Sequence, residues 1–333
     1  MNKWIVVTSI NVPQKAIMAI SELCKSDGWR CVVVGDKKTP INWYAKNIDF
    51  LSLDDQDKIY PNLSEMLPLN HYCRKNIGYI FAATNGADII LETDDDNIPL
   101  ANFGKNINKS VDGRLLGESD WINVYKYFTD SLIWPRGNPL DSIFDIGKVL
   151  NYNYSSECPI QQYLADGDPD VDAIYRLIFK ANINFRNDES PVILSSGTWC
   201  SFNSQNTLFF KEYFPLLYLP CFVSFRMTDI WRSFVAQVVL WSEGKHLSFS
   251  KASVVQVRNE HNLMSDFNDE VVGYQNNREI CEILKQASLD WTKEMSIKSK
   301  VVSAWASLNA ERYIRDEEIL ILNNWMSNLS DES

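Results

Sequence analysis

Residues 88–97 read DIILETDDDN, an apolar run that ends directly in three adjacent carboxylates. Such a run predicts a buried β-strand whose carboxyl end opens into a polar loop. Crowded carboxylates repel one another, and a divalent cation such as Mg²⁺ or Mn²⁺, which prefers oxygen ligands, relieves that repulsion. The stretch therefore predicts an α/β protein with a cation site at Asp94 and Asp96. The alternative is a solvated acidic turn, because a D-x-D pattern alone is weak evidence.

Earlier segments show the same order of strand and helix. Residues 4–7 (WIVV) and 31–34 (CVVV) are apolar runs, each followed by polar residues, at 8–11 and 35–36. A helix pattern follows the first run, and another spans about residues 70–84. Repeated βα units with continuous apolar strands predict a mostly parallel, Rossmann-like central sheet flanked by helices. Ligands of such sheets bind at the carboxyl ends of the strands, so the polar groups there are candidate binding residues.

The remaining chain predicts an irregular middle and a helical end. Short strands are expected at 191–195 and 247–257, and a helix at 229–241. From about residue 277 onward, apolar side chains recur at helical spacing in three successive stripes. We expect these stripes to pack on the preceding domain or on another subunit of a homo-oligomer. The predicted organisation is a domain at residues 1–268 and a C-terminal helical appendage at 269–333.

Composition narrows the classes of function. The chain has 333 residues with 32 Lys and Arg against 43 Asp and Glu, a net charge of −11. An acidic chain is poorly suited to bind nucleic acid or an anionic membrane surface through its overall field. The most apolar later stretch, residues 214–225, is too short for a transmembrane segment and contains two prolines. Residues 1–9 predict a first strand rather than a signal peptide, and seven scattered cysteines without a C-x-x-C pair favour reduced thiols in the cytoplasm.

Several ordered segments resemble one protein family. Residues 75–79 (KNIGY), followed by the acidic strand, resemble the core of the STELLO glycosyltransferase-like proteins. Residues 133–137 (IWPRG), 168–177 (DPDVDAIYRL) and 229–232 (DIWR) resemble the same family. A more distant similarity links the acidic strand to plant reversibly glycosylated polypeptides, which act as UDP-arabinopyranose mutases. The resemblance implies a GT-A fold, a metal-bound nucleotide sugar and glycosyl transfer. We expect no N-terminal membrane anchor like that of the plant Golgi proteins, so the resemblance implies the fold but neither their location nor their cellulose-related role.

The resemblance also implies a metal site. A cation, Mn²⁺ or Mg²⁺, is expected on Asp94, Asp96 and a late histidine, His261, which would bind as neutral imidazole. Asp94 could instead face the ribose, leaving Asp96 directly on the metal, and the sequence does not separate these arrangements. The alternative for His261 is a surface histidine beside Glu260.

The expected catalytic base is Asp229, at the start of a predicted amphipathic helix. The helix dipole favours the ionised carboxylate, which could remove the proton of the acceptor hydroxyl as it attacks the anomeric carbon. The alternative is an N-cap, a position that aspartate also favours. A glycine-containing loop at residues 195–199 is the expected counterpart of the acceptor-side loop of GT-A enzymes.

The donor is expected to contact strand-end polar groups and nearby cations. Strand-end side chains would hold the nucleoside, and arginine and lysine would hold the diphosphate, with turn residues and surface cations as the alternatives. The residues expected to contact the donor are Thr8, Asn11, Asp36, Arg74, Lys75, Asp94, Asp95, Arg136 and Arg232. Aromatic residues of the middle, such as Trp121, Trp134 and Trp199, could form a sugar-stacking cleft but are more often core.

The sequence thus favours a cytoplasmic, metal-dependent glycosyltransferase that uses a nucleotide sugar, which we expect to be a UDP-sugar. The acceptor would be a glycan or a lipid-linked glycan, as in surface polysaccharide assembly. One alternative is a mutase that interconverts ring forms of a nucleotide sugar. Another is a non-catalytic assembly factor with a GT-A-like fold, which the joint presence of Asp94, Asp96, Asp229 and His261 disfavours.

Overall fold

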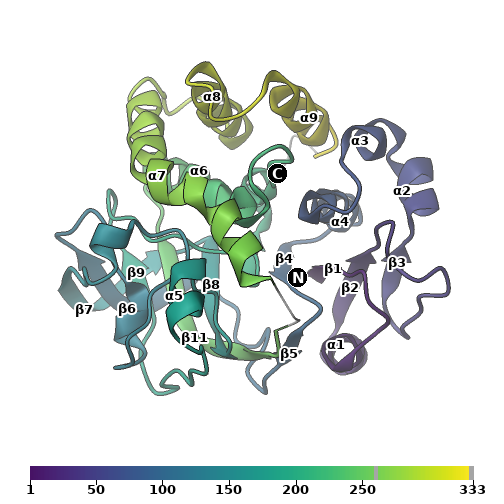
Figure 1. The fold of residues 1–333 in the computed structure, drawn as a ribbon, viewed down its shortest axis with the longest axis horizontal. Helices are drawn as coiled ribbons and strands as arrows, with labels where there is room; N and C mark the ends of the chain where they lie inside the picture. Colours follow the sequence, from purple (N-terminus) through teal and green to yellow (C-terminus); the bar gives the residue numbers. More distant parts are fainter. Residues whose placement is uncertain (259–261, 330–333) are drawn as a thin grey trace.

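The computed structural model describes residues 1–258 and 262–329. Within these ranges the strands form one eleven-stranded mixed sheet with helices packed around it (Figure 1). The strands are β1 Lys3–Thr8, β2 Trp29–Val34, β3 Asp49–Leu51, β4 Ile89–Thr93, β5 Asn97–Pro99, β6 Ser110–Gly117, β7 Lys148–Glu157, β8 Ile160–Gly167, β9 Val192–Leu194, β10 Asn206–Phe210 and β11 Leu247–Gln256. The α-helices are α1 Lys15–Ser26, α2 Leu53–Ile59, α3 Pro61–Met66, α4 Lys75–Thr84, α5 Ala173–Ile178, α6 Thr228–Ser242, α7 Leu263–Ser288, α8 Ile297–Ala310 and α9 Asp316–Ser327. Short 3₁₀ turns include η1 Tyr72–Arg74, η2 Val124–Tyr127, η3 Leu140–Ser142, η4 Lys211–Leu217 and η5 Phe225–Met227.

The first half of the sheet is parallel, as the sequence predicted. β1 pairs in parallel with β2 on one side and with β4 on the other, and β2 pairs in parallel with β3. Alternate side chains of β1 enter two different cores: Trp4 and Val6 share one with α4, whereas Ile5 and Val7 share the other with α1. This part of the sheet is therefore covered on both faces.

Gly78 explains part of the KNIGY segment. A Cβ at this position would lie 2.6 Å from Val6 Cγ1 and 2.8 Å from Val34 Cγ2, closer than packed carbon atoms allow. Glycine in the middle of a helix costs about 1 kcal/mol relative to alanine. Here it lets α4 lie directly on β1 and β2, which places the N-terminus of α4 beside the carboxyl ends of those strands.

Beyond β4 the expectation of a mostly parallel sheet is wrong. The strand order is β3-β2-β1-β4-β10-β8-β11-β9-β6-β7, and β5 pairs with β11. β10 is antiparallel to both β4 and β8, β6 is antiparallel to β7, and β11 is antiparallel to β5 and β9. The chain after residue 98 connects most of these strands through irregular segments instead of repeating βα units. Antiparallel pairing needs no crossover helix, so such segments can place strands in either direction.

The three C-terminal helices pack on the rest of the same chain. α7 crosses the predicted boundary at 268/269 as one continuous helix. α7 and α8 contact α6, and α9 contacts α3, so the three lie along one side of the molecule (Figure 1). Apolar residues of all three stripes belong to the core that includes β1 and α4, and Trp325 Nε1 donates a hydrogen bond to the carbonyl of Asn76 at 3.0 Å.

Two further expectations concern the whole chain. Among the described residues, no helix combines the length and apolar character required to cross a membrane. The seven cysteines are all free thiols, and six of them are buried.

The packing of α9 leads to a stability prediction. Trp325 is fully buried, so Trp325→Ala is expected to lower the free energy of unfolding by about 3–5 kcal/mol. Leu320 on the same helix is 62% exposed, and Leu320→Ala should change it by less than about 0.5 kcal/mol. Urea unfolding of both variants measures the difference. Equal, small effects would mean that α9 does not share the central core.

Candidate functional site

A cavity of about 580 Å³ opens at the carboxyl ends of β1, β2 and β4. The chain runs from β1 outward through β2 to β3 and then returns to β4 on the other side of β1. This reversal is a topological switch point, where open α/β sheets bind ligands. Six of the predicted strand-end residues line the cavity: Thr8, Asn11, Asp36, Asp94, Asp95 and Asp96. Parallel topology brings them to one edge although they come from three separate loops.

Two of these carboxylates hold the strand-end loops together. Asp95 Oδ2 accepts hydrogen bonds from Ser9 Oγ at 2.5 Å and Asn11 Nδ2 at 3.1 Å, across the switch point. Burial raises the pKa of Asp95, and these two hydrogen bonds oppose the increase. Asp36 accepts from the backbone N–H groups of Asn70 and His71 at 2.9 and 3.0 Å. Both side chains therefore join loops that are distant in sequence, while both still border the cavity.

Asp94 and Asp96 have different surroundings. Asp94 Oδ1 accepts a hydrogen bond from the hydroxyl of Tyr72 at 2.7 Å and forms an ion pair with Lys75 Nζ at 3.2 Å. Lys75 is fully buried and also donates to the carbonyl of Thr93 at 2.8 Å. Asp96 instead contacts the side-chain amide of Gln256, at 3.4 and 3.5 Å. Asp94 thus has an internal cation, which supplies part of the charge compensation that the acidic run requires.

The donor set of the expected metal site is only partly described. Within residues 1–258 and 262–329, no group of three or more His, Cys, Asp or Glu side chains is arranged to hold a metal ion. His261, the expected third ligand, lies outside the described residues. Two carboxylates on a cavity wall nevertheless fit Mg²⁺ or Mn²⁺ chemistry, because such ions often take one or two carboxylates and complete their shell with water and substrate phosphates.

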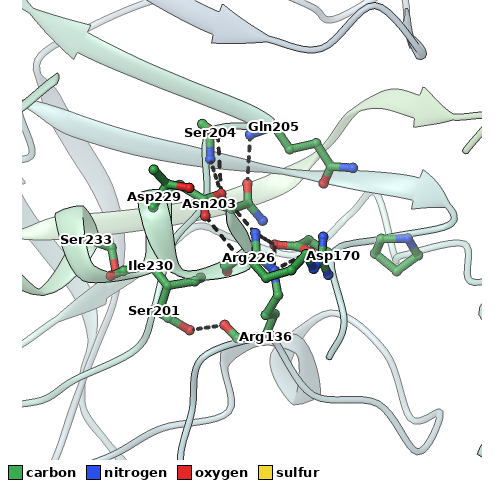
Figure 2. Close-up of polar contacts among 12 residues, drawn as sticks. Arg136, Asp170, Ser201, Asn203, Ser204, Gln205, Arg226, Asp229, Ile230 and Ser233 are labelled. Carbon is green, nitrogen blue, oxygen red and sulfur yellow. Dashed lines mark hydrogen bonds and ion pairs between the residues drawn. The ribbon is translucent and has the colours of Figure 1, made fainter. Parts of the chain in front are cut away.

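Arg136 joins the predicted base to the acidic turn before α5 (Figure 2). Its Nε and Nη2 donate to the two oxygens of Asp170 at 2.9 and 2.8 Å, and its Nη1 and Nη2 donate to the two oxygens of Asp229 at 3.0 and 2.9 Å. Nη1 also donates to the carbonyl of Arg226. A guanidinium has five N–H donors, so this set of contacts uses all of them.

Asp229 is buried on the cavity wall and ionised. Burial alone would raise the pKa of Asp229, but the guanidinium of Arg136 outweighs that effect and lowers it. Asp229 Oδ2 also accepts from the backbone N–H of Ser204 at 3.2 Å. The N-cap alternative is wrong: α6 begins at Thr228 after Met227, and Asp229 lies inside the first turn, with its carboxylate turned to Arg136 and Ser204.

The other predicted phosphate-binding cations are held by protein groups. Arg232 is 1% exposed, does not line the cavity, and donates from Nη1 and Nη2 to the two oxygens of Glu92 at 2.9 and 2.6 Å. Arg74 borders the cavity, but its guanidinium donates to Gln56 at 2.9 Å and to the hydroxyl of Ser64 at 2.7 Å. With Lys75 bound to Asp94 and Arg136 fully engaged, these four cations primarily stabilise the walls of the site.

The cavity also contains residues that the sequence reasoning missed. Arg226 and Arg258 line it, and so does the segment 203–205, whereas the expected acceptor loop at 195–199 does not. A local signal existed for both arginines, because each precedes a singled-out residue, Asp229 or His261, by three positions. The large aromatic residues of the middle, including Trp121, Trp134 and Trp199, are at most 4% exposed and belong to the core.

The fold and the cavity define an α/β protein with a candidate ligand site at the strand ends. The family model described as STELLO glycosyltransferases matches residues 226–332. The proteins named "Probable glycosyltransferase STELLO2" and "Probable glycosyltransferase STELLO1" of Arabidopsis thaliana are each 30% identical to this chain over 269 residues, covering 74% of it. The predicted resemblance to the STELLO glycosyltransferases is therefore confirmed. The chain aligns with only 34% of the length of each relative.

The Arg136 contacts generate a pH-dependent stability prediction. Arg136→Met removes the cation that contacts both Asp170 and Asp229 and leaves Asp170 with the more distant Arg226, so a loss of about 3–5 kcal/mol of unfolding free energy is expected at pH 7. Arg30→Met, which removes a half-exposed ion pair with Asp49, is the control and should cost less than about 1 kcal/mol.

The sign of the pH effect follows from the pKa shifts. In the wild type Arg136 helps to lower the pKa of Asp170 to about 2, so the stabilisation is complete above the ordinary aspartate range and is lost as pH falls toward 2. Without the guanidinium of Arg136, the effect of burial is less offset and both carboxyl pKa values should rise relative to the wild type. Protonation on acidification then removes part of the buried charge that destabilises the variant. Urea unfolding should therefore show a smaller deficit at pH 4.5 than at pH 7. A deficit independent of pH would contradict this assignment.

Proposed function

We propose that this chain is a metal-dependent glycosyltransferase with a GT-A fold, which transfers a sugar from a nucleotide sugar, expected to be a UDP-sugar, to a glycan or lipid-linked glycan. The observation that carries the proposal is that Asp94, Asp96 and Asp229 line one cavity at a topological switch point. The similarity to the STELLO glycosyltransferases supports the same reaction class. The cavity volume of about 580 Å³ lies within the usual range for small-molecule sites.

The proposed donor orientation follows the charges along the cavity. Thr8, Asn11 and Asp36 lie at the ends of β1 and β2 and would contact the nucleoside. Asp94 and Asp96 would hold the divalent cation, which neutralises charge that develops on the leaving diphosphate. Lys75 pairs with Asp94, so a cation bound there would share this carboxylate with the lysine, and both arrangements that the sequence left open remain proposals.

Asp229 would bind the acceptor hydroxyl through Oδ1. A carboxylate oxygen has about two lone pairs. Oδ2 accepts from Arg136, from the backbone N–H of Ser204 and from its hydroxyl, whereas Oδ1 accepts one hydrogen bond, from Arg136. The hydroxyl proton would pass to Oδ1 as the oxygen attacks the anomeric carbon. Arg136 keeps Asp229 ionised at neutral pH and fixes its orientation, while the lowered pKa makes it a weaker base.

Asp229 and Asp170 offer a matched pair of variants for the base. Both contact Arg136, but only Asp229 is assigned the proton. Asp229→Asn is expected to reduce transfer by at least about 10²-fold, the usual contribution of a general base, with donor affinity nearly unchanged. Asp170→Asn perturbs the same guanidinium and should retain more activity. Transfer at wild-type rates by Asp229→Asn would remove the base assignment.

Metal removal tests the donor site. Titration calorimetry with UDP and Mn²⁺ should show binding that EDTA abolishes and that Asp96→Asn weakens more than about tenfold, since even outer-shell changes near metals cost 10–100-fold. Asp49→Asn, a half-exposed change on β3 outside the cavity lining, is the control.

Incubation with UDP-sugars and Mn²⁺ then separates the reaction classes. Free UDP in the presence of an acceptor supports transfer. A changed sugar ring without UDP release would identify a mutase instead. Failure to bind any nucleotide would refute the enzyme assignment and favour the assembly-factor alternative.

A further inference from the structure

Two arginines that line the cavity, Arg226 and Arg258, pair with carboxylates of α7. Arg226 Nε donates to Glu270 Oε1 at 2.9 Å, and Arg258 Nη2 donates to Asp266 Oδ2 at 2.9 Å. Asp266 and Glu270 are both buried and lie four residues apart on α7, so they share one face of that helix. Both arginines also line the cavity. α7 therefore fixes the position of two guanidinium groups that border the ligand space.

Arg226 has a donor without an acceptor. Its Nη2 is buried and has no hydrogen-bond partner in the described part of the chain. The carboxylate oxygen Asp170 Oδ1 lies 3.8 Å away, too far for a hydrogen bond, and Arg136 already contacts both oxygens of Asp170. A buried donor left unpaired is destabilising, and more so when the group is charged. An anionic ligand in this corner of the cavity would provide the missing acceptor for Arg226 Nη2.

Arg258 is crowded by other cations. Burial, together with the nearby charges of Arg176 and Arg226, lowers the pKa of Arg258 to about 10. Asp266 is the ion-pair partner that the structure gives it. An anion placed against Arg226 and Arg258 would offset both the burial and the mutual repulsion.

We propose that Arg226 and Arg258 form an anion-binding corner of the cavity that receives a phosphate or diphosphate group of a substrate. The choice of ligand rests on the proposed function. Arginine forks match phosphate oxygens in bidentate geometry, and two forks offer more donors than a single carboxylate can use. Arg226 lies three residues before Asp229, and Arg258 two residues after Gln256, which contacts Asp96. The corner is thus connected to both the expected acceptor side and the expected metal side, so the phosphate belongs either to the donor or to a phosphorylated acceptor.

Pyrophosphate binding without a divalent cation tests the corner directly. Isothermal titration of the full chain in EDTA should show pyrophosphate binding that Arg226→Gln and Arg258→Gln each weaken by about tenfold or more. Arg278→Gln removes an arginine that pairs with Asp141 outside the cavity and should leave the affinity unchanged. Arg226→Lys keeps the positive charge next to Glu270 but loses the bidentate guanidinium. This variant should therefore fold but bind pyrophosphate more weakly than the wild type does. Thermal unfolding of each variant checks that the fold is retained.

Two further ligands identify which substrate carries the phosphate. A parallel loss of affinity for UDP with Mn²⁺ would assign the corner to the donor diphosphate. Retained UDP affinity, with lost affinity for a sugar 1-phosphate, would assign it to a phosphorylated acceptor. The proposal is overturned if the wild type does not bind pyrophosphate, or if the two glutamine variants bind it as the wild type does. If the wild type binds UDP with Mn²⁺ but not pyrophosphate alone, the corner proposal fails and the proposed function stands. Asp96→Asn should weaken Mn²⁺-dependent UDP binding and keep metal-free pyrophosphate binding.

Discussion

The guanidinium of Arg136 connects the chain segments that carry Asp170 and Asp229, two residues that line the cavity. A buried cation is tolerated only where nearby groups satisfy its charge and its N–H donors. Asp170, from the turn before α5, and Asp229, from the first turn of α6, meet this requirement together with the carbonyl of Arg226. Three chain segments distant in sequence are thus held at one point, and the position of Asp229 depends on it.

A second buried pair places α6 against the acidic strand. Arg232 and Glu92 are both essentially inaccessible, and Arg232 binds both carboxylate oxygens of Glu92 on β4. Asp229 and Arg232 lie three residues apart on α6, so this helix carries one residue that faces the cavity and another that anchors to β4. The distance between the acidic strand end and Asp229 is therefore controlled by paired charges in the core.

The N-terminal half of the fold was predictable from sequence because its information is local. Strand 4–7 and strand 31–34 are continuous apolar runs with helix patterns between them, which fixes a parallel arrangement. The position of β10 between β4 and β8 was not predictable from the sequence. β10 pairs with β4, whose residues lie more than a hundred positions earlier in the chain. No local pattern at 206–210 encodes the direction of that pairing.

The candidate site was likewise predictable only where its residues are placed by local sequence patterns. Strand-end residues such as Asn11 and Asp95 could be placed, because parallel strands bring their carboxyl ends to one edge. The roles of the arginines could not be assigned, since Arg226 and Arg232 are the same residue type near the same motif. One borders the cavity and the other is buried against Glu92, and only the three-dimensional position of a carboxylate partner decides which.

In the proposed complex, the cavity binds a nucleotide sugar with its diphosphate between the acidic strand end and the arginine corner. A crystal structure of the full chain with UDP and Mn²⁺ tests it most directly. We expect the uracil and ribose near Asn11 and Asp36, the metal on the carboxylates of the acidic strand end, and phosphate oxygens directed toward Arg226 or Arg258. UDP bound elsewhere, or a cavity that remains free of nucleotide at saturating UDP and Mn²⁺, would contradict it.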